Sequence, residues 1–302
     1  MLNILTHSEN RNMNLSVIIP TLNNKEGLKY LLNYFKNTQY DVVIVDNKPN
    51  EEKKKIVMNY GLGVRWIKYL SQKRNLGFAI AVNRGAKNIK TKWMLILNDD
   101  IQFESTKIQI PRNKQDPNNK SQIKNEETIQ RLINFAEKNN LDAVSPILKN
   151  PDGKVENYGY KVLPYGKVEL VRELTGSRVN PTSPRLRGAS ELDGLTAACL
   201  LVKTKVFREL KGFDEKFFAY LEDVDFFLRF KKVGYKLGLA TNVEVLHNHM
   251  TTTKTMGNFK AKQDMVNWWR LYFKHRGKFK LDFKFIIERL RNVSGFIKAS
   301  LR

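Results

Sequence analysis

Two adjacent aspartates follow a run of large apolar residues in the stretch "WMLILNDD", residues 93–100. Five consecutive apolar residues, 93–97, are typical of a strand that is buried on both faces of a sheet. Carboxylates beside such a strand are costly to bury unless a positive group compensates their charge. Asp99 and Asp100 therefore suit a hard-oxygen site for Mg²⁺ or Mn²⁺ that is shared with substrate phosphates. The structural alternative for this pair is a turn or a helix cap.

A second acidic cluster lies in "LEDVD", residues 221–225, at the predicted start of a helix. The helix dipole favours negative charge there, so an N-terminal cap is the alternative to a catalytic role. The preceding segment, 217–220, is rich in aromatic residues, which indicates a partly desolvated carboxylate suited to act as a general base. Glu222 and Asp223 lie at the turn, where a side chain can reach a cleft. Asp225 lies within the helix, where it can cap the helix or pair with an arginine four residues later.

Two histidines, His247 and His249, stand at the exit of a predicted strand, 237–249. A single histidine more often has a structural role, but one that meets an aspartate-bound metal becomes a ligand. The sequence leaves open which of the two faces the metal.

The first hundred residues alternate between predicted strands and helices, an order that indicates a mostly parallel sheet with helices on both faces. We expect strands at 15–20, 41–47, 64–67 and 93–97, and helices from Asn23 or Asn24 to Phe35, near 51–60 and within 75–89. Ligands of such sheets bind beyond the carboxyl ends of the strands. Those ends are Pro20-Thr21, Asp46-Asn47 and Asn98-Asp99-Asp100.

The order of elements changes after residue 103. The segment 104–127 is polar and rich in turn residues, and is interpreted as an insertion. Further elements are expected as follows: a helix at 127–139, a strand at 141–148, a β-hairpin within 150–168, a loop at 178–188, a buried strand at 192–202, a helix from Asp223 and the strand at 237–249. We divide the chain into an N-terminal extension (1–13), a main domain (14–250) and a basic, helical C-terminal extension (251–302).

The C-terminal extension has the pattern of an amphipathic helix. Its apolar residues hold helical spacing on one face: Phe283, Ile286, Ile287, Leu290, Val293 and Ile297. Ten Lys and Arg residues lie between Arg270 and Arg302, against Asp282 and Glu288. A basic amphipathic helix fits contact with an anionic membrane surface. The alternative is a solvated helix that covers the main domain.

Composition narrows the class of protein. At 302 residues, the chain can form one large domain or two small ones. A single cysteine excludes an internal disulfide, and the N-terminus lacks the pattern of a signal peptide, so we expect a cytoplasmic protein. The formal net charge of +23 indicates attraction to a polyanion, an anionic membrane or phosphorylated substrates, unless it is only a lysine-rich surface.

Five segments together resemble one known family, the inverting glycosyltransferases of family 2, which have the GT-A nucleotide-sugar fold. The segments are "SVIIPTLNNKEGLKYLL", "VVIVDN", "NLGFAIAVNRGAK", "LNDD" and "GFDEKFFAYLEDVDFFLRFKKVGYKL". The last one is similar to the acceptor segment of the bacterial rhamnosyltransferase-like subgroup. The resemblance covers about residues 14–250, and it implies an α/β fold with a mostly parallel central sheet and flanking helices.

The resemblance also implies roles on the donor side. Thr21 and Asp46 would contact the nucleobase and ribose, and Arg74 and Asn75 would lie over the nucleotide. Asp99 would face the ribose or the metal.

The remaining roles concern the metal and the acceptor. Asp100 would ligate a Mn²⁺ or Mg²⁺ ion that bridges the diphosphate, and His247 would approach the metal or the diphosphate. Asp223 would be the catalytic base, with Glu222 beside it on the acceptor side. Asn98 replaces the first aspartate of the family's Asp-x-Asp element, which leaves the division of labour between the two following aspartates open.

The implied reaction is a single displacement at the anomeric carbon of a nucleotide-activated sugar. A carboxylate takes the proton of the acceptor hydroxyl, and the anomeric centre inverts. No covalent intermediate is needed, so Cys199 is expected in the core. The implied donor is UDP- or dTDP-linked, the sugar is rhamnose or another hexose, and the acceptor is a glycan or lipid-linked glycan at the inner face of the plasma membrane, in cell-surface polysaccharide synthesis.

Two other classes of function fit parts of the sequence. The positive charge alone would suit nucleic-acid binding, but we find no nucleic-acid motif and expect no stretch in which basic residues are interleaved with exposed aromatic residues. A catalytically inactive nucleotide-sugar-binding module would bind the donor without turnover. The full set of carboxylates argues against it.

Overall fold

The computed structural model describes residues 14–36, 38–61, 67–103, 124–172, 192–248 and 258–300. Most of the predicted insertion, the predicted loop 178–188 and His249 lie outside these ranges. So do three of the four residues of the strand predicted at 64–67.

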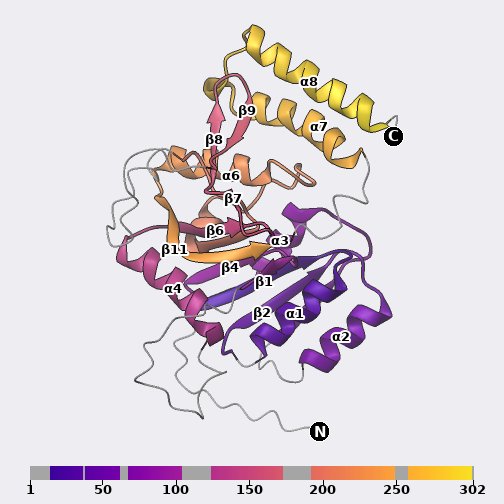
Figure 1. Ribbon diagram of the computed structural model, residues 1–302, viewed down its shortest axis with the longest axis vertical. Coiled ribbons are helices and arrows are strands. Elements are labelled where there is room, and N and C mark those ends of the chain that lie inside the picture. Colours follow the sequence, from indigo (N-terminus) through magenta and orange to yellow (C-terminus); the bar gives the residue numbers. More distant parts are fainter. Residues whose placement is uncertain are drawn as a thin grey trace.

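The N-terminal half forms the parallel sheet that the sequence predicts (Figure 1). Its strands are β1 (Leu15–Thr21), β2 (Asp41–Asp46), β3 (Ile67–Ser71) and β4 (Trp93–Leu97), and they lie in the order β3-β2-β1-β4. The helices between them are α1 (Lys25–Phe35), α2 (Glu51–Gly61) and α3 (Phe78–Ala86). The side chain of Asn24 caps α1, because its Oδ1 accepts a hydrogen bond from Gly27 N.

The second half makes the sheet mixed. It contributes β5 (Ile101–Gln102), β6 (Ala143–Lys149), β7 (Val155–Asn157), β10 (Cys199–Lys203) and β11 (Leu237–His247). β10 lies antiparallel between β4 and β6, whereas β11 runs parallel to β6. β5 and β7 are also antiparallel to their neighbours. An apolar run predicts a buried strand but not its direction, because burial on both faces is the same for either direction.

The strand predicted at 192–202 begins only at Cys199. The preceding residues, 192–198, are mostly buried but irregular, with one isolated bridge between Tyr160 and Gly194. Their apolar character therefore reflects burial rather than pairing in the sheet. Cys199 itself is buried in the core, as predicted.

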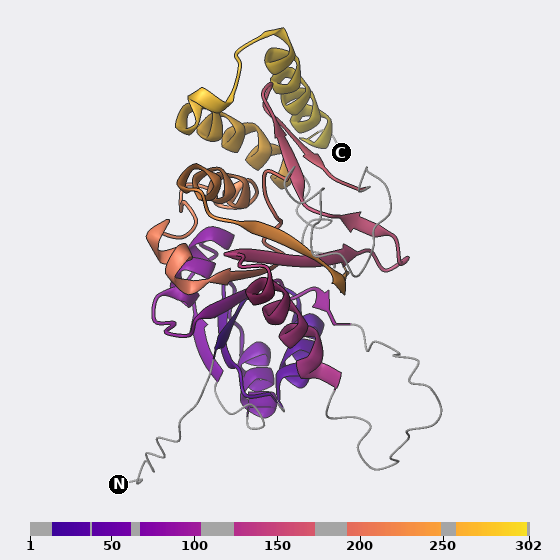
Figure 2. The same ribbon diagram turned by 90° about the vertical axis from the view of Figure 1, so that its left-hand side faces the viewer.

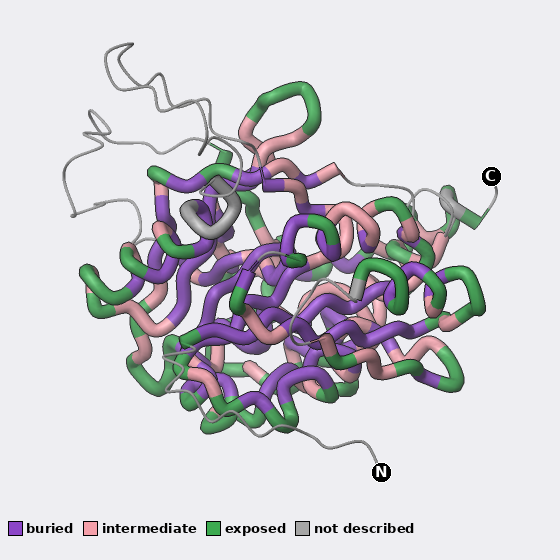
Figure 3. The backbone as a smooth tube through the Cα atoms, turned by 90° about the horizontal axis from the view of Figure 1, so that it is seen from below, coloured by how far each residue is buried: buried purple, intermediate pink, exposed green. Residues whose placement is uncertain are grey.

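Alternate residues of the buried strands pack into two cores, one on each face of the sheet. Val17 and Ile19 of β1 join the core with α1, α2 and α4 (Lys124–Lys138), while Ile18 joins the other core. That second core contains α3, α5 (Thr204–Glu209) and α6 (Glu222–Val233). Figure 3 shows the buried strands at the centre and exposed loops at the periphery.

The C-terminal part packs on this second core. It comprises α7 (Phe259–Lys274), a short 3-10 helix η2 (Arg276–Lys278) and α8 (Phe283–Ser300), and it lies beside the hairpin of β8 (Tyr160–Leu163) and β9 (Lys167–Leu170) (Figures 1 and 2). Phe279 and Phe285 are buried in this core, where their rings contact aromatic residues of α7. In the described chain, no helix has the length and apolarity needed to cross a membrane.

Candidate active site

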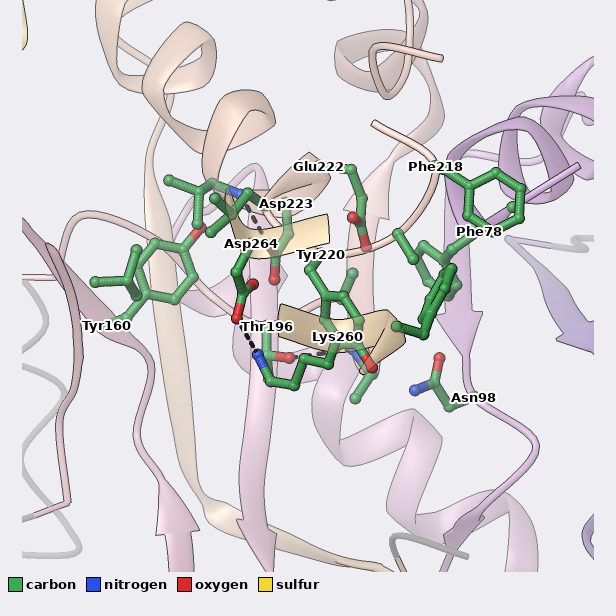
Figure 4. A pocket seen from close by; sticks show the side chains of 18 of the residues that line it. Phe78, Asn98, Tyr160, Thr196, Phe218, Tyr220, Glu222, Asp223, Lys260 and Asp264 are labelled. Atoms are coloured by element: carbon green, nitrogen blue, oxygen red, sulfur yellow. Dashed lines mark hydrogen bonds and ion pairs between the residues drawn. The ribbon is translucent and has the colours of Figure 1, made fainter. Parts of the chain in front are cut away.

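A cavity of about 700 Å³ opens beyond the carboxyl ends of the strands, where the parallel order predicts ligand binding. Its wall comes from both halves of the chain. Polar lining residues include Thr21, Asn47, Asn75, Asn98, Asp99, Asp100, Glu156, Thr196, Glu222, Asp223, His247, Lys260, Asp264 and Arg289. Figure 4 shows Asn98 on one side of the labelled group and Tyr160 on the other, with Glu222 and Asp223 between them.

Asp99 and Asp100 lie in the turn after β4. Hydrogen bonds to their main-chain carbonyls hold this turn in place. Asn24 donates from Nδ2 to the Asp99 carbonyl at 2.8 Å, and Asn248 N donates to the Asp100 carbonyl at 2.9 Å. Burial raises the pKa of the Asp99 carboxyl to about 7. The Thr21 hydroxyl opposes this rise, and the charge of Asp100 adds to it. Two carboxylates crowded in this way favour the approach of a cation.

The structure brings His247 to Asp100. His247 Nε2 lies 3.3 Å from Asp100 Oδ1, and Nδ1 lies 2.8 Å from Oε2 of Glu156 in β7. Burial lowers the pKa of His247, but the carboxylates of Asp100 and Glu156 raise it, with a net result of about 9. Glu156 was not foreseen, because its position in the predicted hairpin gave no sign that it faces the end of β11.

Within the described residues, no group of three or more His, Cys, Asp and Glu side chains is arranged to hold a metal ion. Two protein ligands suit Mg²⁺ or Mn²⁺ nonetheless, because these ions often take most of their ligands from phosphates and water. Asp100 Oδ1 and His247 Nε2, 3.3 Å apart, would hold such an ion, with His247 giving up its proton when the ion binds.

Asp46 lies at the end of β2 as predicted, but it is not one of the described residues that line the cavity. It is fully buried, pairs with Lys53 of α2, and accepts a hydrogen bond from the Tyr69 hydroxyl at 2.6 Å. The next residue, Asn47, lines the cavity instead. Because Asp46 is buried and already paired with Lys53, it stabilises the end of β2 rather than forming part of the cavity wall.

Asn75 lines the cavity, whereas Arg74 is exposed and is absent from the described cavity wall. Asn75 Oδ1 accepts a hydrogen bond from Gly77 N at 3.0 Å. Gly77 has φ +88° and packs so closely on Phe218 that an added Cβ would lie 2.2 Å from its carbonyl oxygen. Glycine is therefore needed here, where the start of α3 meets the segment that leads to Glu222.

Glu222 and Asp223 begin α6, and their carboxyl groups lie side by side at the cavity (Figure 4). Tyr220 and Leu221, just before them, have φ of 66° and 68°, in the left-handed region that non-glycine residues rarely adopt. Asn267 of α7 donates from Nδ2 to the carbonyls of Ala219 and Tyr220, both at 2.8 Å. Strained backbone of this kind is typical of functional sites.

Burial raises the pKa of both carboxyls. The negative charge of Asp223 raises the pKa of Glu222 further, whereas the Val224 N–H, which donates to Asp223 Oδ1 at 2.8 Å, opposes the rise at Asp223. Among the described residues, Glu222 Oε2 is buried without a hydrogen-bond partner. The pair thus combines a better stabilised carboxylate at Asp223 with a more readily protonated group at Glu222.

Asp225 points away from the cavity, into a cluster of basic residues. The predicted pair with Arg229 is present at 2.8 Å, and Lys274 and His275 each lie 2.8 Å from Asp225. Burial raises its pKa, but these partners lower it more, so that it lies below the usual range. Asp225 therefore joins α6 to the end of α7.

Several cavity residues were missed by sequence reasoning because they come from the C-terminal part. Lys260 pairs with Asp264 at 2.8 Å and lies over the ring of Tyr220, 4.5 Å from its centroid. Arg289 of α8 is buried and stacks over Trp268 at 4.3 Å. Burial lowers its pKa to about 10, so that it stays charged at neutral pH. No sequence signal distinguished these residues from the other basic residues of the extension.

Comparison with protein families identifies residues 16–119 by the family model "Glycosyl transferase family 2". A relative from Mycobacterium tuberculosis, N-acetylglucosaminyl-diphospho-decaprenol L-rhamnosyltransferase, is 25% identical over 211 residues, which are 62% of this chain. The chain spans about 60% of the length of that relative. Low-salt glycan biosynthesis hexosyltransferase Agl10 of Haloferax volcanii is 22% identical over 262 residues, 84% of this chain and 73% of that protein.

Solved structures agree on the fold. TarS of S. aureus has a TM-score of 0.57 at 18% identity, covering 93% of this chain and 43% of that one. The mannosyltransferase PcManGT of Pyrobaculum calidifontis, solved with GDP-Man and Mn²⁺, has a TM-score of 0.57 at 14% identity. The match covers 95% of this chain and 73% of that one. The resemblance drawn from the sequence is thus confirmed: residues 16–119 match the family 2 glycosyltransferase model, and the fold is that of the GT-A glycosyltransferases.

Proposed function

We propose that the protein transfers a sugar, rhamnose or another hexose, from a nucleotide-diphosphate donor to a glycan or lipid-linked glycan, with inversion at the anomeric carbon. The observation that carries this proposal is one cavity lined at one place by Asp99, Asp100 and His247 and at another by Glu222 and Asp223. An inverting displacement needs these two groups separately. One stands at the leaving diphosphate, and the other takes the proton of the attacking hydroxyl.

On the donor side, Thr21, Asn47 and Asn75 line the cavity and are suited to contact the nucleoside. Asp46 would support this surface through its pair with Lys53 rather than bind the ribose directly. Asp100 and His247 would hold a divalent cation, Mn²⁺ or Mg²⁺, with Asp99 beside them. When bound, that cation would neutralise the charge that develops on the diphosphate.

On the acceptor side, Asp223 is the proposed base. Its pKa is raised by burial yet stays below that of Glu222, so Asp223 is the member of the pair better able to be ionised at neutral pH and accept a proton. Glu222 would stand beside it against the acceptor. Thr196, from the irregular segment before β10, lines the same region.

The comparisons support the donor and acceptor classes without deciding between members of each. PcManGT was solved with GDP-Man, TarS with UDP, and GalNAc-T7 with UDP, GalNAc and Mn²⁺. The mycobacterial relative is named for a diphosphate-linked lipid acceptor and a rhamnosyl product. We therefore keep UDP- and dTDP-linked sugars as the donors to test first, with acceptors that are presented at the inner face of the plasma membrane in polysaccharide synthesis.

The proposal is tested by a thermal-shift screen of nucleoside diphosphates and nucleotide sugars, each with and without Mn²⁺. We expect one nucleotide class to raise the melting temperature only when Mn²⁺ is present. Asp100→Ala should weaken this metal-dependent binding by roughly 100-fold or more, because it removes a direct ligand rather than a supporting group. A matched control is Asp152→Ala, which changes an exposed aspartate of the β6–β7 turn.

Metal-dependent binding that is undiminished in Asp100→Ala would remove Asp100 from the metal site. Donor binding with no sugar transfer to any acceptor would favour an inactive nucleotide-sugar-binding module. Nucleic-acid binding that weakens steeply with salt, in the absence of nucleotide binding, would overturn the proposal altogether.

A further inference from the structure

Exposed apolar side chains are concentrated in the C-terminal helices. Among the described residues, eight of the twelve large hydrophobic side chains with high exposure lie between Phe259 and Ser300. Five of them form one stripe along α8: Phe283, Ile286, Leu290, Val293 and Ile297. Their exposed fractions run from 39% at Val293 to 75% at Phe283. Single exposed apolar residues are ordinary, but a continuous helical stripe of this kind marks an interaction surface.

The stripe lies beside the face by which α8 is attached to the domain. Phe285 and Arg289, four residues apart, are buried against α7 and the β8–β9 hairpin. The stripe residues recur at intervals of three and four, so they share one face of the helix, which is adjacent to that contact and is left exposed. Packing of the domain therefore already uses one side of α8 and leaves the apolar stripe unused.

A row of positive charges borders the stripe. Lys284, Arg291 and Lys298 are exposed and seven residues apart, so they lie along one edge of α8. Of the two acidic residues of this region, Glu288 pairs with Arg291 at 2.5 Å, so among the described residues the unpaired positive charge of the row comes from Lys284 and Lys298. Asp282 accepts a hydrogen bond from Phe285 N at the start of the helix, and Glu288 lines the cavity. An apolar stripe bordered by Lys and Arg is the pattern of a helix that lies in a bilayer interface.

We propose that this stripe and its basic edge dock the protein on an anionic lipid bilayer, with α8 lying in the plane of the surface. Charge complementarity selects this occupant, because the basic edge would repel the same edge of a second copy but attract anionic headgroups. The inward face of α8 supplies Glu288, Arg289 and Asn292 to the cavity wall. Docking would therefore bring the wall of the cavity to the membrane surface, where a lipid-linked acceptor is held. This last consequence rests on the proposed function; the docking itself does not.

The test uses the full chain and point substitutions, because truncation would remove the buried Phe279 and Phe285. Leu290→Glu combined with Ile297→Glu places charge on the stripe, and Met58→Glu combined with Val233→Glu is the matched control on other helices. Co-sedimentation is measured with phosphatidylcholine vesicles containing 30% phosphatidylglycerol and with pure phosphatidylcholine vesicles. We expect the wild type to bind the anionic vesicles, and the stripe variant to lose roughly 10- to 100-fold in partition coefficient while the control variant does not.

A second pair of variants tests the basic edge. Lys284→Glu combined with Lys298→Glu should lower binding to the anionic vesicles by about 10-fold or more and leave the weak binding to pure phosphatidylcholine unchanged. Lys54→Glu combined with Lys55→Glu on α2 is the charge-matched control. Wild-type protein that stays in the supernatant with anionic vesicles would overturn the proposal, and so would a stripe variant that sediments like the wild type.

Sedimentation velocity without vesicles tests the other occupant of the stripe. A wild-type dimer that the stripe variant dissociates, together with an absence of vesicle binding, would identify the stripe as a contact between two copies and overturn the membrane proposal. A monomer that binds anionic vesicles would support it. These measurements need no sugar transfer, so failure of docking and failure of the proposed enzymatic function give different results.

Discussion

The proposed donor and acceptor ends of the cavity are built in different ways. At the donor end, polar side chains follow directly from parallel strands, and the turns after β1, β2 and β4 meet because those strands are neighbours. At the acceptor end, Glu222 and Asp223 sit on a strained turn whose carbonyls are bound by Asn267, more than forty residues later in the chain. The donor end is thus positioned by the sheet itself, and the acceptor end by helices packed above it.

Because of this difference, the two ends depend on different contacts. The donor end depends on buried ionic and hydrogen-bonded pairs within the first hundred residues, such as Asp46 with Lys53. The acceptor end depends on aromatic packing between α6, α7 and α8. Asp225 of α6 also pairs with Lys274 and His275 at the end of α7. Changes in the C-terminal helices should therefore alter the position of the proposed base, Asp223, but not the binding of the nucleotide.

The largest effect is expected at the base. Asp223→Asn should lower kcat by about 10²–10⁴-fold, the usual contribution of a positioned general base, with donor and metal affinity near the wild-type value. Steady-state kinetics with donor and acceptor varied separately measure both quantities. Near-normal turnover in Asp223→Asn with collapse in Glu222→Gln would transfer the role of base to Glu222.

Lys53→Met should destabilise the domain at the donor end of the cavity. It leaves the fully buried Asp46 carboxylate without its cation, and removing one partner of a buried pair destabilises a protein by about 3–5 kcal/mol. Chemical denaturation measures the change in the free energy of unfolding. Lys54→Met is the control, because the neighbouring Lys54 makes an exposed pair with Glu51. Equal stability of the two variants would mean that the buried pair does not support the strand end.

Phe285→Ala should loosen the acceptor end. The side chain is fully buried among Trp269, Tyr272 and Gly166, and truncating a buried phenylalanine costs about 3–5 kcal/mol. Phe283→Ala, two residues earlier on the exposed stripe, should change stability by less than about 0.5 kcal/mol. If both variants unfold alike, α8 does not pack as described.

Asn267→Ala should act on the base through the strained turn. It removes two hydrogen bonds to the carbonyls of Ala219 and Tyr220, so Glu222 and Asp223 would lose their fixed position. We expect kcat to fall by about 10-fold with the KM for the donor unchanged, because misplacement by a fraction of an ångström weakens only the chemical step. A parallel loss of donor affinity would instead indicate general unfolding of the domain.

The smallest effect concerns stability and pH. Burial and the charge of Asp223 raise the pKa of Glu222, so ionised Glu222 destabilises the fold. This cost begins as pH rises above the carboxyl pKa of the unfolded chain, about 4.3, and is complete only above the raised pKa of the folded state. Glu222→Gln should therefore raise the melting temperature by about 2–4 °C at pH 8 and change it little at pH 5. The same rise at both pH values would show that ionisation is not the cause.

Sequence reasoning located many of the residues that line the cavity because the relevant signals are local. A buried strand that ends in Asp99-Asp100, a cap at Asn24 and three carboxylates at the start of a helix are patterns of adjacent residues. The pairing of Asp225 with Arg229 follows from helical spacing alone, and the structure confirms it. The family model matches residues 16–119, and the solved structures extend the likeness of fold over 93–95% of the chain.

The rest depended on contacts between distant residues. Nothing in the sequence distinguishes Asp46, held by Lys53 below the cavity, from Asn47, which lines it. Three further features each join segments that pack only after the chain has folded. They are the antiparallel direction of β10, the contact of Glu156 with His247, and the hydrogen bonds from Asn267 to the turn before Glu222.

The amino-acid sequence by itself determined β1, β2 and β4 of the N-terminal sheet, the acidic groups at their ends and the amphipathic pattern of α8, because each depends on the period of a single element. Only the tertiary structure decided which polar groups share one cavity, which carboxyls are desolvated enough for their pKa to rise, and which face of α8 is left exposed. Burial and charge depend on neighbours from other elements, and the packing of α7 and α8 over α6 supplies those neighbours.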